Sequence, residues 1–368
     1  MNLNELGWNN FFDDNFNRIK IEGQKAARVT GEQRNLYRVM SEDGELTAEV
    51  SGKLRYRSQS RADFPAVGDW VVIEPVTDES KAVIRAVLPR KSAFSRKAVL
   101  SGGMPDTGGK TDEQILAANI DTVFLVSGLD GDFNIRRIER YVTIAWDSGA
   151  TPVIVLNKID LCDDLEATIE QVETVVFGVD ILPVSATDGA GLEEINAFLS
   201  AGRTAVFLGS SGVGKSSIIN ALLGEERLKV QAVRDYDKRG RHTTTHREMI
   251  VIPGGGIVID TPGLREIQIW LDEEGIKRTF PDIEALAMQC RFSDCRHQTE
   301  PGCAVKAAIK NGELDEGRYN NYLKLQKELE HLARRQNQKE ARRSERDFDK
   351  RIRQILKERE NLKKRGLI

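Results

Sequence analysis

The 368-residue sequence has no long apolar run and only four cysteines. No stretch approaches the roughly 18 consecutive apolar residues that a membrane-spanning helix needs. Residues 1–5 do not form a basic region followed by an apolar segment, so we expect no export signal. Four cysteines in a chain of this length are too few for the disulfide framework of a secreted protein. We therefore predict a cytoplasmic protein that is not held at a membrane.

Charge is distributed unevenly along the chain. The net charge is −3, but residues 318–368 contain 17 Lys and Arg against 8 Asp and Glu, a balance of +9, which leaves −12 on residues 1–317. A basic tail on an acidic body indicates that one end of the chain meets a polyanion. A solvated charged helix has the same composition, and the two interpretations stay open here.

Residues 1–105 contain short strand-like runs separated by turn residues. The runs are 26–29, 36–39, 46–50 and 70–73, and turns fall at 42–44, 51–52 and 67–69. Several short strands at this spacing predict a small all-β barrel of the oligonucleotide-binding type, although other small barrels share the signature. Residues 54–57, Leu-Arg-Tyr-Arg, alternate basic and aromatic side chains, as a base-stacking surface would, and a plain edge strand looks the same.

A change of pattern follows the barrel region. Residues 90–111 are basic, polar and glycine-rich, and we expect a linker here, with 106–111 as the connection itself. Beyond it, apolar strands at 122–126, 152–156 and 181–184 alternate with helical spacing at 135–146, 165–177 and 191–199. This alternation predicts a parallel, helix-covered sheet, an α/β domain over residues 112–270.

A phosphate-binding loop lies inside this α/β region. It consists of Gly209, Ser210, Ser211, Gly212, Val213, Gly214, Lys215 and Ser216, and Ser217 follows. An apolar strand-like run precedes the loop and a helix-like run follows it, which is the context that the motif requires. The backbone N–H groups and the helix N-terminus would cradle phosphates, Lys215 would reach the β- and γ-phosphates, and Ser216 would ligate Mg²⁺.

A guanine-binding signature precedes the phosphate loop. Asn157, Lys158, Ile159 and Asp160 leave the end of a buried strand, and Ser185 and Ala186 leave the next one. The Asp160 carboxylate would accept hydrogen bonds from the N1–H and exocyclic amine of guanine, a pair of donors that adenine lacks. The Lys158 stem would lie over the base, Asn157 would tie loops together, and an N–H at Ser185–Ala186 would meet the guanine carbonyl.

Two further segments have the features of nucleotide switches. Asp260 and Gly263 end a strand, and we expect Asp260 to hold Mg²⁺ through water and the Gly263 N–H to meet the γ-phosphate. One of the threonines in 243–245, with Thr244 as a candidate, would complete the Mg²⁺ shell. Leu264 stands where a water-orienting Gln would be, so intrinsic hydrolysis should be slow. His242 is the preferred candidate to orient water, and His246 is the other.

The order of these motifs is unusual, because the base-reading residues come before the phosphate loop. A circularly permuted chain can still assemble one site, since domain termini often lie close together. The permutation would connect the second switch directly to the C-terminal region. We therefore hypothesise that loss of the γ-phosphate moves that region.

The C-terminal part contains a candidate metal site and the basic tail. Cys290, Cys295, His297 and Cys303 lie within 14 residues and predict a closed, structural tetrahedral zinc site in a domain at 271–317, whereas Cys162 lies outside it. Residues 318–368 have helical spacing, with one apolar stripe at Tyr322, Leu325, Leu329 and Leu332 and a second at Phe348, Ile352, Ile355 and Leu362. The basic side chains between them suit contact with double-stranded RNA that weakens with salt.

The base-first order, residues 209–217 and residues 240–245 resemble the ribosome-small-subunit-dependent GTPase A family. The resemblance implies a circularly permuted GTPase with an N-terminal barrel and a mainly α C-terminal zinc domain. It also implies GTP binding at 157–160 and 209–217 and zinc at the four named positions. We expect a monomeric switch that binds rRNA on the small ribosomal subunit and hydrolyses GTP when stimulated by it. The alternatives are a nucleotide-gated RNA-binding module with incidental turnover and, less in keeping with the motifs, a small-molecule kinase.

Overall fold

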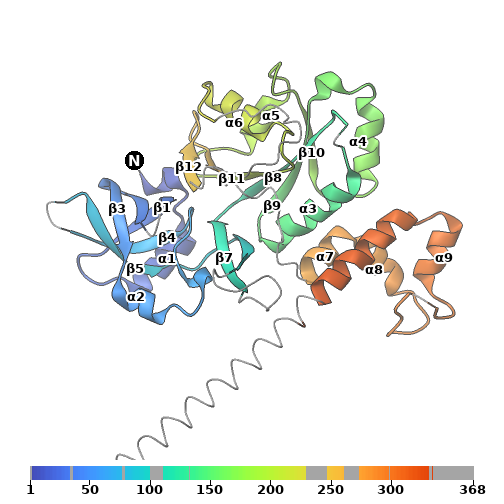
Figure 1. Cartoon of the computed structure of the whole chain (residues 1–368), viewed down its shortest axis with the longest axis horizontal. Coiled ribbons are helices and arrows are strands. Elements are labelled where there is room, and N and C mark those ends of the chain that lie inside the picture. Colours follow the sequence, from blue (N-terminus) through green and yellow to red (C-terminus); the bar gives the residue numbers. More distant parts are fainter. Residues whose placement is uncertain are drawn as a thin grey trace, which may run out of the picture.

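The computed structural model describes residues 2–33, 36–76, 79–99, 111–131, 133–228, 247–260, 273–297, 299–330 and 334. Three regions follow one another across the molecule (Figure 1). The N-terminal strands lie at one side, the α/β sheet and its helices lie in the middle, and the C-terminal helices lie at the other side.

The N-terminal region is a closed five-stranded barrel, as predicted. Its strands are β1 (Lys25–Gln33), β2 (Leu36–Ser41), β3 (Gly44–Val50), β4 (Trp70–Pro75) and β5 (Lys81–Val87). The order β1-β2-β3-β5-β4 closes through an antiparallel β1–β4 pairing, and β3 pairs with β5 in parallel. Alternate residues point inward, so that Val29, Val39, Ile73 and Ile84 form the barrel core.

Short helices cover the barrel. Helices η1 (Leu3–Leu6) and α1 (Asn10–Ile19) precede it, and η2 (Arg61–Asp63) follows α2 (Gly52–Arg57). Residues 54–57 therefore form a helix, and their interpretation as an edge strand was wrong. Ser51 begins this helix because its Oγ accepts a hydrogen bond from the Leu54 N–H at 3.2 Å. The helix carries the Tyr56 side chain outward, 91% exposed.

Part of the predicted linker is a β-strand. Strands β6 (Ala93–Val99) and β7 (Thr111–Ala118) pair antiparallel in a two-stranded sheet of their own. Phe94 and Leu116 are buried in the α/β core, which explains why a polar-looking segment is ordered. Residues 100–110, the glycine-rich part of the expected linker, lie outside the described residues.

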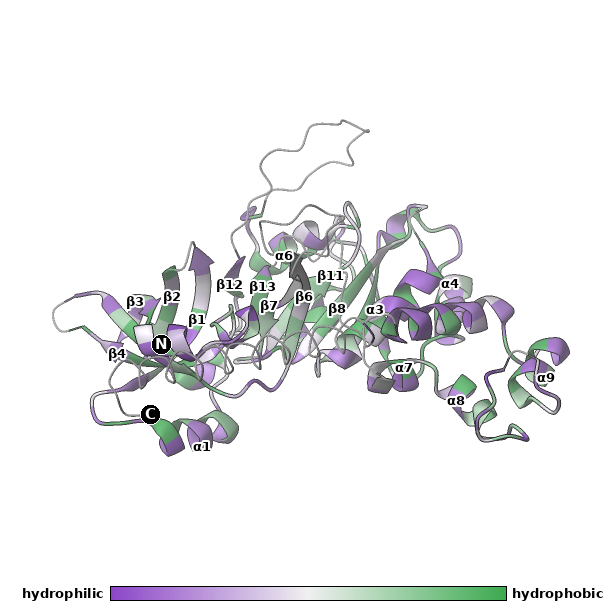
Figure 2. Cartoon of the chain, turned by 60° about the horizontal axis from the view of Figure 1, so that its bottom comes forward, coloured by the Kyte–Doolittle hydropathy of each residue, from purple (hydrophilic) through white to green (hydrophobic). Residues whose placement is uncertain are grey.

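The central sheet has the predicted parallel architecture. Its strands are β8 (Thr122–Gly128), β9 (Thr151–Asn157), β10 (Asp180–Val184), β11 (Thr204–Leu208), β12 (Arg247–Val251) and β13 (Ile257–Asp260). They lie in the order β10-β9-β8-β11-β13-β12, and only β12 runs antiparallel to its neighbour β13. In Figure 2 the central strands β8, β11 and β13 are mostly green, the colour of hydrophobic residues, as expected for strands buried on both faces.

Helices α3 (Ile135–Asp147), α4 (Leu165–Glu173), α5 (Leu192–Ala197) and α6 (Lys215–Leu223) connect these strands, with η3 (Ile159–Leu161) after β9. Helix α4 ends before the predicted limit at residue 177. Thr174 caps the helix, and Val175 and Val176 are buried in the core beyond it.

The barrel and the α/β region share one continuous sheet, which the sequence had not indicated. Strand β1 pairs with β12 through Gly31–Glu248 and Glu32–Arg247. The buried Arg28 guanidinium spans the same junction and donates to Thr204 Oγ1 at 2.9 Å and to the carbonyl of Asn119 at 3.2 Å. Burial lowers its pKa to about 10, so Arg28 is still charged at neutral pH.

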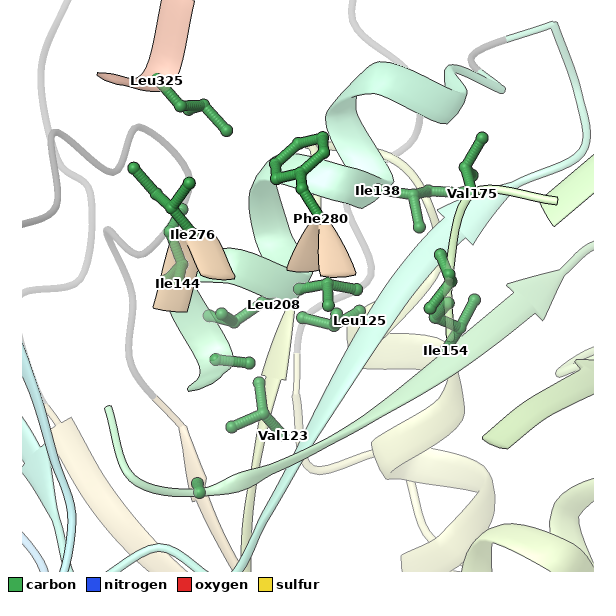
Figure 3. Packing of buried hydrophobic residues seen from close by; sticks show 14 of the residues in the cluster. Val123, Leu125, Ile138, Ile144, Ile154, Val175, Leu208, Ile276, Phe280 and Leu325 are labelled. Carbon is green, nitrogen blue, oxygen red and sulfur yellow. The ribbon is translucent and has the colours of Figure 1, made fainter. Parts of the chain in front are cut away.

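The C-terminal region consists of α7 (Glu273–Thr279), α8 (Pro281–Ala287), α9 (Ala304–Asn311) and a helix at 316–330. Helix α7 packs against α3, and α8 packs against α7 and α9. The helix at 316–330 is hydrogen-bonded to α3. Ile276, Phe280 and Leu325 join the same buried cluster as Leu125 and Ile144 of the α/β region, and Figure 3 shows them together. The C-terminal region thus shares its core with the α/β region rather than building its own.

The basic tail is described only at its start. Tyr322 and Leu325 are buried and Leu329 packs against the core, which confirms this part of the first predicted stripe. Leu332 and the second stripe lie outside the described residues. Among the helices that the structure describes, none combines the length and the apolar character needed to cross a bilayer.

Candidate functional site

The predicted phosphate loop connects β11 to α6. Its conformation needs glycine, because Gly212 and Gly214 have φ of 83° and 97°. A Cβ at Gly214 would overlap Asn157 Nδ2, and one at Gly209 would overlap the Val126 carbonyl. The loop is therefore pressed against the ends of β8 and β9, and it has the strand–loop–helix setting that the motif requires.

The cation of the loop lies at the start of α6. Lys215 Nζ donates to the carbonyls of Gly209 at 2.7 Å and Ser210 at 2.5 Å, so it folds over the loop. Ser216 and Ser217 follow in the first turn of α6. Asp260 ends β13, the parallel neighbour of β11, so its carboxylate and the Ser216 hydroxyl lie at the same edge of the sheet. Oxygen ligands of this kind fit Mg²⁺.

Asn157 joins the base-reading segments to the phosphate loop. Its side chain is 2% exposed, and Nδ2 donates to the Val213 carbonyl at 2.8 Å. Its Oδ1 accepts the Ala186 N–H at 3.2 Å. One buried amide therefore ties together three loops that lie up to 56 residues apart, which is the role expected of Asn157.

Lys158 and Asp160 lie on either side of this clamp. Lys158 has a φ of 67°, and its Nζ donates to the Gly212 carbonyl at 2.8 Å and pairs with Asp130. Asp160 Oδ1 accepts the Ser185 hydroxyl at 2.8 Å. Asp160 itself is exposed. Ile159 lies between them in η3 and packs partly against the core.

Sequence reasoning missed two side chains of this site. Asp130 follows β8 and holds Lys158. Arg137, in the first turns of α3, donates from Nη1 to Ser210 Oγ at 2.6 Å. The signal for Asp130 was its place just after a buried parallel strand, where ligand-binding groups collect. No comparable signal marked Arg137, whose contact spans 73 residues of sequence.

Several predicted residues lie outside the described part of the chain. These are His242, Thr243, Thr244, Thr245, His246, Gly263 and Leu264. Both expected switches therefore stay predictions, and only Asp260 of the second one is placed.

The second constellation is the predicted metal cluster. The ligand atoms of Cys290, Cys295, His297 and Cys303 all lie within 4.8 Å of one another. Cys290 Sγ is 3.9 Å from Cys303 Sγ, and His297 Nδ1 is 3.5 Å and 3.4 Å from these two sulfurs. Zinc–sulfur bonds of ~2.3 Å in a tetrahedron place the sulfurs roughly 3.8 Å apart. The donor set and its spacing therefore fit zinc.

The surroundings of the cluster shift the pKa values of its ligands in different directions. Burial raises the pKa of the Cys290 thiol, but hydrogen bonds from the N–H groups of Val305 and Ala304 at the start of α9, and from the Cys303 and Cys295 thiols, outweigh it and lower the pKa. Burial is the largest cause that raises the pKa of Cys295, to about 11. Burial lowers the pKa of His297, which favours neutral imidazole. The Tyr319 hydroxyl donates to the His297 carbonyl at 3.1 Å and links the cluster to the helix at 316–330. Cys162 lies apart from the cluster, as predicted, with its Sγ 3.7 Å from Thr168 Oγ1.

Taken together, the fold and this site define a class. Strand β11 carries the phosphate loop, and strands β9 and β10, which carry the predicted base-reading residues and lie beyond β8 in the sheet, come earlier in the chain. The molecule is a P-loop GTPase with a circularly permuted sheet, an N-terminal barrel and a C-terminal Cys₃His cluster.

Comparison with known proteins identifies the family. A family model described as RsgA GTPase matches residues 87–270. A second model, described as 50S ribosome-binding GTPase, matches residues 204–342, which begin at β11 and include the phosphate loop. The small ribosomal subunit biogenesis GTPase RsgA of Opitutus terrae is 45% identical over 99% of this chain and 100% of its own length. RsgA 1 of Oceanobacillus iheyensis is 45% identical over 93% of this chain and 95% of its own.

Solved structures agree on the architecture. The crystal structure of YjeQ from Thermotoga maritima is 30% identical and covers 83% of this chain and 98% of its own, with a TM-score of 0.59. That of YloQ, a circularly permuted GTPase, has the same TM-score at 24% identity, with 84% of this chain and 96% of its own covered, and shows the fold alone. The chain belongs to the RsgA family of small ribosomal subunit biogenesis GTPases.

Proposed function

We propose that the chain binds GTP with Mg²⁺ at the ends of β9, β10, β11 and β13. The phosphates would lie over the loop at 209–217, and Ser216 would ligate the metal directly. Asp260 would hold it through water. The observation that supports this arrangement best is the Asn157 clamp, because it joins the loop for phosphate to the loops for the base.

Guanine would be recognised by Asp160. The Ser185 hydroxyl occupies one side of its Oδ1 and orients the carboxylate, and the carboxylate accepts from the N1–H and the exocyclic amine of the base. Lys158, held by Asp130 and the Gly212 carbonyl, would place its stem along one face of the ring. The Ala186 N–H already donates to Asn157 Oδ1. With guanine bound, the same N–H would donate a bifurcated hydrogen bond to Asn157 Oδ1 and to the guanine carbonyl.

Hydrolysis would depend on a partner. Leu264 cannot orient water, so His242 and one of the threonines at 243–245 would complete the site on the small subunit. This makes GTP hydrolysis a timed event on the small ribosomal subunit, after which the protein leaves.

Docking would use both ends of the molecule. On the barrel, helix α2 exposes Tyr56, and its sequence neighbours Arg55 and Arg57 are exposed as well. At the other end, the basic residues of 318–368 would follow rRNA phosphates. Zinc at the Cys₃His cluster would stabilise the domain proposed at 271–317. The basic tail, which follows this domain, would then have a fixed starting point. We propose that the protein is a cytoplasmic monomer when it is not on the subunit.

The test is GTP turnover with and without purified small subunits, with large subunits as the matched control. We expect stimulation by small subunits only, weakening as salt rises. Equal turnover in all arms, with nucleotide-dependent RNA binding retained, would instead support the alternative of an RNA-binding module with incidental hydrolysis.

A further inference from the structure

Arg137 is a cation of helix α3 that bonds the phosphate loop from outside the known motifs. Its Nη1 donates to Ser210 Oγ at 2.6 Å, and the contact is half-buried. The carbonyl of Ser210 in turn accepts from Lys215 Nζ. The side chain and the backbone of one loop residue are thus held by two different cations. The shape of a phosphate loop matters for rate, because its N–H groups act only when they point at the phosphates.

Helix α3 is anchored on its other side by the C-terminal region. Glu139, which is 0% exposed, accepts from Arg318 Nη1 at 2.6 Å and from Asn321 Nδ2 at 2.8 Å. Arg318, 2% exposed, also donates to Asp282 Oδ1 at 2.7 Å. Near the surface, Arg140 pairs with Glu328 at 3.0 Å.

These two sets of contacts share one rigid element. Residues 136, 139 and 140 lie along one stripe of the helix, at spacings of three and four, and residue 137 lies on the flank of that stripe. Buried ion pairs with several hydrogen bonds hold a fixed geometry, because any displacement leaves a charge unpaired. A shift of the helix at 316–330 therefore displaces α3 as a body, and the Arg137 guanidinium moves with it.

We propose that Arg137 is a positioning residue for GTP hydrolysis. It sets the phosphate loop through Ser210, and the C-terminal helix sets Arg137 through α3. The trigger, engagement of the C-terminal region by the small subunit, rests on the function proposed above. The positioning role does not, because it belongs to the free protein.

The first experiment uses the full chain without ribosomal subunits. We compare Arg137→Ala, Arg137→Lys and Ser210→Ala with Arg203→Ala, which breaks an exposed ion pair with Asp121 just before β11, at its far end from the loop. Single-turnover hydrolysis, GDP affinity and thermal unfolding are measured for each. We expect Arg137→Ala to slow hydrolysis about tenfold to a hundredfold, the range for loss of a charged hydrogen bond. We expect GDP affinity to change less than the rate does.

The remaining variants separate positioning from plain stability. Arg137→Ala combined with Ser210→Ala should be no slower than Arg137→Ala alone, because both remove one interaction. Arg137→Lys should recover part of the rate, and Arg203→Ala should leave it unchanged. A rate for Arg137→Ala equal to wild type would overturn the positioning role. A slower rate that comes with an equally large fold-loss of GDP affinity and with a lower melting temperature would overturn it as well.

The second experiment tests the link to the C-terminal helix. Glu328→Ala removes the exposed pair with Arg140 without touching the buried network. It should change the hydrolysis rate in the wild-type background and leave it unchanged in the Arg137→Ala background. An equal effect in both backgrounds, or none in the wild type, would overturn the link. A failure of subunit stimulation with these results intact would count only against the proposed docking function.

Discussion

Removal of the Asn157 side chain should separate nucleotide binding from general stability. Asn157→Ala deletes the bond from Nδ2 to the Val213 carbonyl at 2.8 Å and the bond from the Ala186 N–H to Oδ1 at 3.2 Å. Each buried polar group left without a partner costs about 1–3 kcal/mol, so the two together cost roughly 2–6 kcal/mol. Part of this cost should appear as lost nucleotide affinity, because the bonds join the base-reading loops to the phosphate loop.

Asn220 provides a matched control. It is 7% exposed, its Nδ2 donates to the Leu228 carbonyl at 2.7 Å, and its Oδ1 accepts the Leu228 N–H at 2.8 Å. Asn220→Ala therefore loses the same two kinds of bond within α6 and its following turn. It should cost similar stability in urea unfolding.

GDP affinity is measured by titration with a fluorescent nucleotide, and stability is measured in parallel by urea unfolding. We expect Asn157→Ala to weaken GDP binding at least about tenfold, which is ~1.4 kcal/mol. Asn220→Ala should weaken it less than about threefold, well under 1.4 kcal/mol. Equal losses of GDP affinity in the two variants, or unchanged affinity in Asn157→Ala, would refute the reasoning that the clamp organises the nucleotide site.

Three further outcomes are expected. Asp160→Asn should weaken GTP binding by about a hundredfold or more, since it loses charge-assisted bonds of about 1.5–3 kcal/mol each. The variant should gain affinity for xanthosine nucleotides, because their 2-carbonyl accepts a hydrogen bond from the Asn amide. An unchanged preference for GTP in a competition assay would contradict this prediction. Arg318→Ala leaves the buried Glu139 without its main counter-ion and should lower the free energy of unfolding by about 3–5 kcal/mol. A loss under about 1 kcal/mol would show that Arg136 and Asn321 suffice to stabilise the Glu139 carboxylate. Elemental analysis of the purified protein should find one zinc per chain. Cys303→Ser should lose the zinc and melt at a lower temperature, whereas Cys162→Ser should retain it. A metal-free wild-type protein with an unchanged melting temperature would contradict a structural role for the cluster.

The parts of the structure that local sequence patterns foretold share one property. The phosphate loop, the run at 157–160 and the strands of the sheet each depend on residues within about ten positions of one another, so their chemistry is visible in a short window. The Cys₃His cluster is visible for the same reason, since its ligands lie within 14 residues.

Two short segments adopt structures that their composition did not indicate. Residues 54–57 fit a strand by composition, but a local hydrogen bond from the Leu54 N–H to Ser51 Oγ begins a helix instead. Residues 93–99 have linker composition and become a strand, because β7 pairs with them and the α/β core buries Phe94. Composition is a weak guide in both cases, since a local cap decides the first segment and tertiary contacts decide the second.

By itself the sequence determined the predicted chemistry of this protein: the guanine recognition proposed at Asp160, the phosphate binding proposed at Lys215, the four candidate metal ligands and the rearranged order of the motifs. Tertiary structure alone decided how these parts are joined. The β1–β12 pairing merges the barrel with the central sheet, the core around Phe280 is shared with the C-terminal helices, and Arg137 reaches a loop 73 residues away. Such contacts depend on the packing of surfaces from distant segments, and no window of sequence contains both sides of them.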